Sequence, residues 1–363
     1  MRKILHKIHL WLAIPLGLIV FIICLTGAVL VFQNEIDELI NPDYYFAKEV
    51  VGEPMPIVEL VAKVNSQLPE NTVASVQVPS DAKRNYTVRV AGDRSSIYVD
   101  PYTGEIKGRV QRGGGFTGTI MQLHRWLLSR DIGKPIVGYT TLLFVIILIS
   151  GIVIWWPKTK RQLKNRVQIK TKNGWWRFWY DLHISAGMYV FIGLLVLSLT
   201  GLTYSFSWYS KAFYGAFGVE LPNRQGGGHG GGGRGASEQK IINMGQWQAV
   251  LDKMKFNNPD YRSISMQDGT AIVAQNFTFG NSRASDRFTF DPHTGNITGS
   301  QLYKDQDKSV KVRGWVYSLH VGAWGGLFSK ILTCIIALIG ASLPITGYYI
   351  YFKRHRKKKK KTV

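Results

Sequence analysis

The chain has 363 residues, of which 45% are hydrophobic, and its formal net charge is +22 at pH 7. That charge alone would suggest nucleic-acid binding. However, nearly all of the excess positive charge falls in three acid-free runs beside apolar stretches, at 2–7, 158–177 and 353–361. This distribution is typical of membrane topology and lipid headgroup contact, so we expect no nucleic-acid partner. The two cysteines, Cys24 and Cys334, both lie inside apolar stretches, which excludes a disulfide framework.

Four apolar runs are each long enough to cross a bilayer, at residues 10–32, 136–156, 184–206 and 328–352. We interpret the first run as an uncleaved signal anchor, because it is too long for a signal peptide and no small-residue cleavage site accompanies it. The positive-inside rule predicts that both termini and the middle basic run are cytoplasmic. The two long segments, 33–135 and 207–327, are then expected to face outward.

Each outward segment predicts a small α+β unit. The first combines a helix at 55–68 with strands at 73–78, 86–90, 96–99 and 105–110. The second combines a helix at 244–254 with strands at 261–266, 271–277 and 286–290. Both contain an Asp-Pro-x-Thr-Gly turn, at 100–104 and 291–295. The second also carries a glycine-rich insertion at 226–235, which is typical of flexible polypeptide and makes His229 an improbable ligand.

The predicted fold class is an α-helical membrane protein, a four-transmembrane-helix bundle built as two tandem repeats with one outer α+β domain each. The first repeat comprises transmembrane helix 1 (1–34), outer domain 1 (35–115), and an outer-face histidine segment with transmembrane helix 2 (116–157). A cytoplasmic basic loop (158–177) follows. The second repeat comprises transmembrane helix 3 (178–208), outer domain 2 (209–312), an outer-face histidine segment with transmembrane helix 4 (313–352), and a basic cytoplasmic tail (353–363).

Four histidines introduce the four helices, and each precedes a glycine at a repeated spacing. One spacing is shared by two pairs, His9 with Gly27 and His183 with Gly201. It makes about five helical turns, so each histidine shares a face with its glycine, about 27 Å away. A second, longer spacing is shared by His124 with Gly151 and His320 with Gly347. There we expect Gly133 and Pro135 to interrupt the chain before the second helix.

Topology sorts these histidines into two pairs. His9 and His183 are expected at the cytoplasmic side, and His124 and His320 at the outer side. Two imidazoles from facing helices are the ligand set of a b-type haem, so the pattern predicts two haems b, with the haem iron as the metal bound. A closed zinc site would need more ligands than each pair supplies. The alternative is that the histidines are merely interfacial.

Further residues are candidates for contact with these haems. The four glycines Gly27, Gly201, Gly151 and Gly347 would make room for the macrocycles. His6 lies one turn before His9 and is an alternative ligand. Arg125 and Arg177, with Lys7, would pair either with haem propionates or with lipid phosphates. His293 and His355 are interpreted as solvated, and no catalytic residue is assigned.

The His-x-x-His opening helix, the Asp-Pro-x-Thr-Gly turns and the Leu-His segments before later helices resemble the PepSY-associated transmembrane family. The layout is similar to its FoxB-type members. The resemblance implies periplasmic PepSY-like domains and a bacterial inner-membrane ferric-siderophore reductase. Its electrons would come from a cytoplasmic protein or a quinol and pass to a periplasmic ferric siderophore or other ferric chelate.

The alternative function is a non-enzymatic PepSY membrane protein that regulates a periplasmic peptidase or acts as a sensor. A transporter fits less well, because no buried acid interrupts the apolar runs. The sequence has no Gly-x-Gly-x-x-Gly fingerprint after a strand on the cytoplasmic side, and the basic loop is too short for a nucleotide domain. We therefore expect the electron donor to be a separate molecule.

Overall fold

The computed structural model describes residues 1–68, 72–172, 174–221, 243–276 and 279–359. The chain forms two compact units, which we describe separately. The membrane unit comprises residues 1–32, 119–221 and 316–363, and the sheet unit comprises residues 33–118 and 222–315. The glycine-rich insertion at 226–235, His229 within it, and the last four residues of the tail lie outside the described residues.

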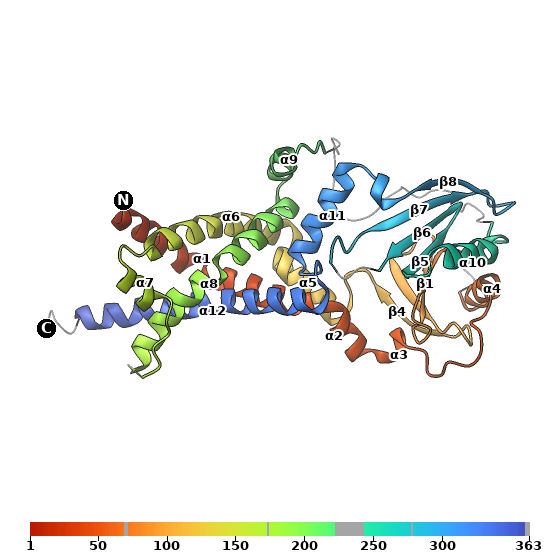
Figure 1. Ribbon diagram of the computed structural model, residues 1–363. Coiled ribbons are helices and arrows are strands. Elements are labelled where there is room, and N and C mark those ends of the chain that lie inside the picture. The colour runs from red at the N-terminus through yellow and green to blue at the C-terminus, as the bar shows by residue number, and fades with distance from the viewer. Residues whose placement is uncertain (69–71, 173, 222–242, 277–278, 360–363) are drawn as a thin grey trace. The chain divides into compact units, whose positions relative to one another are not determined.

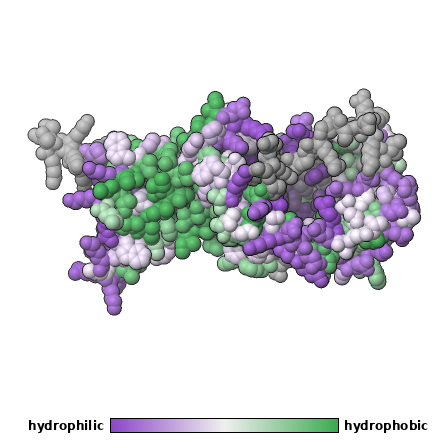
Figure 2. All heavy atoms as spheres, turned by 90° about the horizontal axis from the view of Figure 1, so that it is seen from above, coloured by the Kyte–Doolittle hydropathy of each residue, from purple (hydrophilic) through white to green (hydrophobic). Residues whose placement is uncertain are grey.

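The membrane unit is built on four long helices, α1 (Arg2–Val31), α6 (Arg130–Trp155), α8 (Gly174–Ser205) and α12 (Gly326–Lys359). Within the described residues these four are long and apolar enough to cross a membrane, as predicted. They run side by side, and α1 and α8 each pack against both α6 and α12 (Figure 1). Apolar residues gather over this unit (Figure 2), as expected for a surface that faces lipid.

The N-terminal boundary of the third long helix, predicted at residue 178, differs from the prediction. Helix α8 begins at Gly174, so His183 lies in its third turn instead of at its start. Helix α1 begins at Arg2, and His9 therefore also lies inside a helix. The reason is that the polar and aromatic residues before each apolar run continue the helix, as in the stretch with Trp175 and Trp179.

The expected interruption at Gly133 and Pro135 is wrong, because both residues lie inside α6. The chain breaks earlier, at Leu127 and Leu128, whose φ angles are 48° and 66°. Gly133 is needed for a different reason. A Cβ there would lie 1.8 Å from the carbonyl oxygen of Trp126, so only glycine lets the preceding helix approach this closely.

Shorter helices precede or connect the long helices and the strands. Helix α5 (Gly115–Trp126) ends just before α6 and carries His124, and α11 (Lys308–His320) ends before α12 and carries His320. Other short helices are α2 (Gln33–Ile40), α3 (Pro42–Tyr45), α7 (Lys160–Arg166), α9 (Ser207–Ala216) and the 3-10 helix η1 (Tyr303–Asp305). The sequence analysis did not predict α7, which lies within the basic loop and is capped by Thr159.

The sheet unit contains one antiparallel eight-stranded sheet with strand order β4-β3-β2-β1-β5-β6-β7-β8. The first four strands are β1 (Val73–Pro79), β2 (Tyr86–Val90), β3 (Ser95–Val99) and β4 (Ile106–Gln111). The last four are β5 (Tyr261–Gln267), β6 (Thr270–Gln275), β7 (Ser285–Phe290) and β8 (Ile297–Gln301). The sequence predicted all of these strands except β8.

The two predicted α+β units are therefore not separate domains, because β1 and β5 join them edge to edge. Val76 pairs with Met266, Ser75 pairs with Gln267, and Gln77 pairs with Ser265. The pairing extends to Pro79 with Ser263 and is centred on the Gln77–Ser265 pair. Helices α4 (Ile57–Gln67) and α10 (Trp247–Asn257) cover the same face of the sheet, one for each half (Figure 1).

The core of the sheet unit lies between the two helices and the covered face. Apolar side chains from both halves form one continuous cluster, with Leu60, Val64 and Trp247 wholly buried. Burial of apolar surface stabilises a fold by about 25 cal/mol per Å². A core shared by both halves buries more of this surface than either half would bury alone.

We predict that Leu60→Ala lowers the free energy of unfolding of the sheet unit by about 2–5 kcal/mol, because it removes a fully buried side chain and leaves a cavity. Val58→Ala, on the exposed side of the same helix, should change it by less than about 1 kcal/mol. Thermal unfolding of the detergent-purified variants would measure both. Equal shifts in the two variants would contradict the assignment of the core.

Candidate functional site

His124, on α5, contacts the far half of α1 through three groups. Its Nδ1 lies 2.9 Å from the carbonyl oxygen of Ile23 and 3.1 Å from the hydroxyl of Thr26. A Cβ on the next residue, Gly27, would lie 3.1 Å from Cε1 of the ring. We call such a set of a carbonyl, a hydroxyl and a glycine on the facing helix a cradle.

His320, on α11, occupies an equivalent cradle on α8. Its Nδ1 lies 3.1 Å from the carbonyl oxygen of Leu197 and 3.0 Å from the hydroxyl of Thr200. A Cβ on Gly201 would lie 3.0 Å from Cε1 of the ring. The two outer-side candidates therefore make the same contacts in the two halves of the chain.

His9 and His183 occupy the other two cradles. The Nδ1 of His9 lies 3.0 Å from the carbonyl oxygen of Ile147 and 3.1 Å from the hydroxyl of Ser150, both on α6. The Nδ1 of His183 lies 3.2 Å from the carbonyl oxygen of Leu343 and 2.8 Å from the hydroxyl of Thr346, both on α12. Cβ atoms on the glycines that follow, Gly151 and Gly347, would lie 3.3 and 3.5 Å from the rings.

The carbonyl contact determines the tautomer of each ring. A carbonyl oxygen only accepts, so Nδ1 must carry the proton and donate it. The other nitrogen, Nε2, is then unprotonated and keeps its lone pair. Burial lowers the pKa of His124 and of His320 to about 4, so both rings are neutral at pH 7. Each presents the form of imidazole that binds a metal.

The structure brings His124 and His320 together, with ring centroids 6.4 Å apart. When one metal ion joins two imidazoles through nitrogens at about 2.0–2.1 Å, the ring centroids lie about 6 Å apart. The observed separation therefore fits two axial ligands on one iron. The ring of Tyr204 lies 5.5 Å from that of His320 and forms one side of this site.

The other pair, His9 and His183, lies on α1 and α8, and the two rings are within electrostatic range of each other. His6 is exposed and forms no hydrogen bond with any residue that the structure describes. The cradle on α6 thus holds His9 and not the alternative, His6. The Nδ1 contacts that orient His9 and His183 are of the same kinds as those that orient His124 and His320.

A family model for the PepSY-associated TM region matches residues 6–354, which is nearly the whole chain. The chain belongs to this family. Together with the four long apolar helices, the match makes it a multi-pass membrane protein of the PepSY-associated family. A search of curated proteins finds no match to the chain.

In this PepSY-associated chain the four candidate glycines lie against histidine rings. Gly27, Gly201, Gly151 and Gly347 each admit the imidazole of the facing histidine, and their contact with a macrocycle stays a prediction. The distances of 3.0–3.5 Å from the added Cβ to the ring leave little room for a larger residue. The five-turn spacing within α1 and within α8 thus places a histidine at one end and a histidine-binding glycine at the other.

The two candidate arginines differ in their surroundings. Arg177 donates to the buried carboxylate of Asp181 on the same helix, 2.8 Å away, and its contact with a propionate stays a prediction. Arg125 lies over the ring of Trp126, at 4.8 Å from its centroid, and within electrostatic range of both His124 and His320. Of these two arginines, Arg125 is therefore the cation that accompanies a histidine pair.

The sequence analysis did not assign a role to the cradle hydroxyls, although a signal for them was present. Each hydroxyl residue directly precedes its glycine, in the dipeptides Thr26-Gly27, Ser150-Gly151, Thr200-Gly201 and Thr346-Gly347. No cluster of three or more His, Cys, Asp or Glu residues that could hold a metal ion occurs among the residues described.

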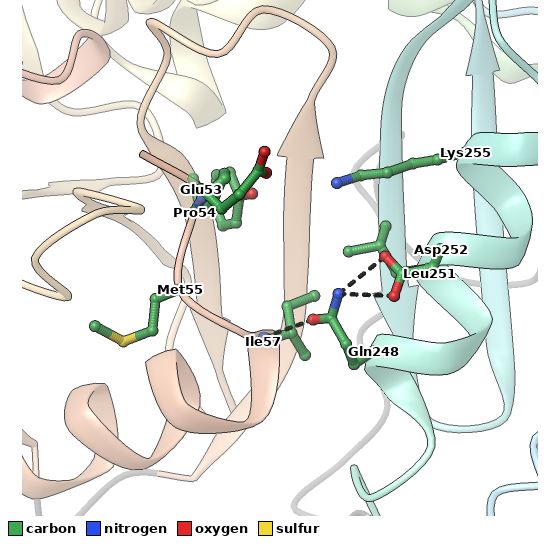
Figure 3. Close-up of a pocket in the computed structure, with 9 residues that line it drawn as sticks. Glu53, Pro54, Met55, Ile57, Gln248, Leu251, Asp252 and Lys255 are labelled. Atoms are coloured by element: carbon green, nitrogen blue, oxygen red, sulfur yellow. Dashed lines mark hydrogen bonds between the residues drawn. The ribbon is translucent and has the colours of Figure 1, made fainter. Parts of the chain in front are cut away.

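The sheet unit contains a cavity of about 100 Å³ where α10 meets the start of α4 (Figure 3). Gln248 lies in its wall, accepts from the backbone N–H of Ile57 at 2.9 Å and donates to Asp252 at 2.9 Å. The first of these bonds satisfies the N–H of Ile57 at the first turn of α4 and joins the two halves, whereas the second orients Gln248 within α10. We assign this cavity a structural role.

We predict that Gly201→Ala destabilises the membrane unit, because the added methyl would lie 3.0 Å from the ring of His320. Gly187→Ala on the same helix meets only Leu343, at 3.6 Å, and should be neutral or stabilising by up to about 1 kcal/mol. In detergent, the melting temperature should fall for Gly201→Ala and should stay unchanged or rise for Gly187→Ala. Stabilisation by both substitutions would show that the ring does not lie against Gly201.

Proposed function

We propose that this protein is a transmembrane b-type oxidoreductase that holds two haems per chain and passes electrons from the cytoplasmic side to ferric chelates outside. The observation that carries the proposal is the pair His124 and His320, whose neutral rings have centroids 6.4 Å apart and whose Nε2 atoms have no hydrogen-bond partner among the described residues. Haem, when bound, would supply one-electron transfer.

Each residue of the candidate site has a role in this function. His9 with His183, and His124 with His320, would hold the two irons through Nε2. The cradles orient the rings and keep the proton on Nδ1. Apolar side chains of α1, α6 and α8 between the two levels, such as Val20, exclude water from the interior of the bundle.

The direction of transfer follows from the charge pattern. The three basic runs support cytoplasmic termini and a cytoplasmic loop, with the sheet unit on the periplasmic side of a bacterial inner membrane. The donor would be a quinol or a separate protein, since between α6 and α8 the described chain forms only the short helix α7. The acceptor would be a ferric siderophore, because reduction to Fe(II) weakens binding by hard oxygen ligands.

The matching cradles support the interpretation of the chain as two tandem copies. The step along the chain from His9 to His183 equals the step from Thr26 to Thr200. In the same way, the step from His124 to His320 equals the step from Ser150 to Thr346. Each copy would thus supply one ligand at each side of the membrane.

The first test is the visible spectrum of the detergent-purified protein, oxidised and dithionite-reduced, with a pyridine haemochrome count. We expect a b-type spectrum and about two haems per chain, from two pairs of axial histidines. A colourless protein from cells supplied with haem would contradict the proposed reductase function and favour the regulatory or sensor function.

The second test assigns the ligands. His183→Ala should lose the cytoplasmic-side haem and retain the other, and His320→Ala should do the reverse, so each variant keeps about one haem. The matched control is His355→Ala, because the ring of His355 is exposed near the end of α12. This variant should keep two haems. Retention of two haems by both ligand variants would mean that the pairing is wrong.

A further inference from the structure

The four cradle hydroxyls share a hydrogen-bond pattern that goes beyond packing. Each donates its own proton to a carbonyl of its own helix, as Thr26 does to Ile22 at 2.6 Å and Thr200 does to Val196 at 2.7 Å. Thr346 donates to Leu343 at 2.9 Å, and Ser150 donates to Ile147 at 2.9 Å. With its proton engaged, each hydroxyl oxygen can only accept from the histidine Nδ1–H.

The four positions have a hydroxyl group in common, but not a methyl group. Three cradles use threonine, but the cradle of His9 uses Ser150, which has no methyl group. The hydroxyl lies 2.8–3.1 Å from Nδ1 in every case. A serine or threonine that only satisfied its own helix could point elsewhere on the helix surface.

We propose that Thr26, Ser150, Thr200 and Thr346 are positioning residues that set the strength of the histidine ligands. The proposal rests on the proposed haem function. A second acceptor on Nδ1–H increases the electron density at Nε2, which makes the ring a stronger ligand and favours the oxidised iron. The hydroxyls would therefore lower the reduction potential of each site and slow the loss of its haem.

The decisive variants are at Thr200, beside His320. Thr200→Val keeps the shape of the side chain and removes the acceptor, whereas Thr200→Ser removes the methyl and keeps the acceptor. The matched control is Thr141→Val on α6, because the hydroxyl of Thr141 bonds only to the carbonyl of Val137, 2.7 Å away, in the part of the chain described.

Redox titration and haem transfer to apomyoglobin would measure the potential and the rate of haem loss. We expect Thr200→Val to raise the potential of one haem and to speed its loss by about ten-fold or more. Thr200→Ser and Thr141→Val should match the unsubstituted protein. An unchanged potential in Thr200→Val, or equal effects of Val and Ser, would overturn the proposal.

A haem-free measurement separates this proposal from the proposed function. In the ¹⁵N-histidine-labelled apoprotein, the Nδ1–H proton resonance of His320 should move upfield in Thr200→Val, because its hydrogen bond weakens. It should not move in Thr200→Ser. A resonance that does not move overturns the role of the hydroxyl. If the resonance moves but the protein never binds haem, the shift supports the role of the hydroxyl, and the lack of haem overturns only the reductase.

Discussion

The hydrogen bond from a histidine Nδ1–H to a helix carbonyl is the interaction on which the membrane unit depends. The carbonyl belongs to a neighbouring long helix and already accepts a bond within that helix, so the imidazole shares it. Because an unpaired polar group inside an apolar bundle costs several kcal/mol, this contact anchors each ring firmly. It also leaves Nε2 without a partner among the described residues, which is costly unless something binds there.

The contacts cross between helices in a reciprocal way. In the first half, His9 on α1 reaches α6, and His124, which leads into α6, reaches back to α1. In the second half, His183 on α8 reaches α12, and His320 reaches back to α8. Each helix hairpin is thus tied at both ends by its own two histidines, and small residues at the contact points allow the approach.

Much of the bundle could be predicted from the sequence, because apolar length and charge bias are local signals. The spacing from His9 to Gly27 is also visible in the sequence. In the structure, His9 contacts α6 and Gly27 contacts the ring of His124. The partner of Gly27 could not be predicted. Its neighbour is His124, which lies beyond the whole first half of the sheet along the chain. The chain break at Leu127 and Leu128 that orients α5 has no glycine or proline to mark it.

The sheet shows a second limit of local reasoning. Alternation of apolar residues predicted most strands, but nothing within 261–267 indicates that it pairs with 73–79, a segment in the other half of the chain. The pairing follows from size. Two halves that join at β1 and β5 share one core, which buries more apolar surface than a helix on four short strands would bury alone.

The histidine pair His124 and His320 also requires both halves of the chain. One helix hairpin carries two histidines, but at opposite ends, so it supplies one imidazole at each level. The 6.4 Å approach of His124 to His320 requires one ring from each half. Neither half of the chain can therefore form a two-ligand site alone, which gives a physical reason for both halves to reside in one polypeptide. Within the sheet unit, the β1–β5 pairing joins the same two halves.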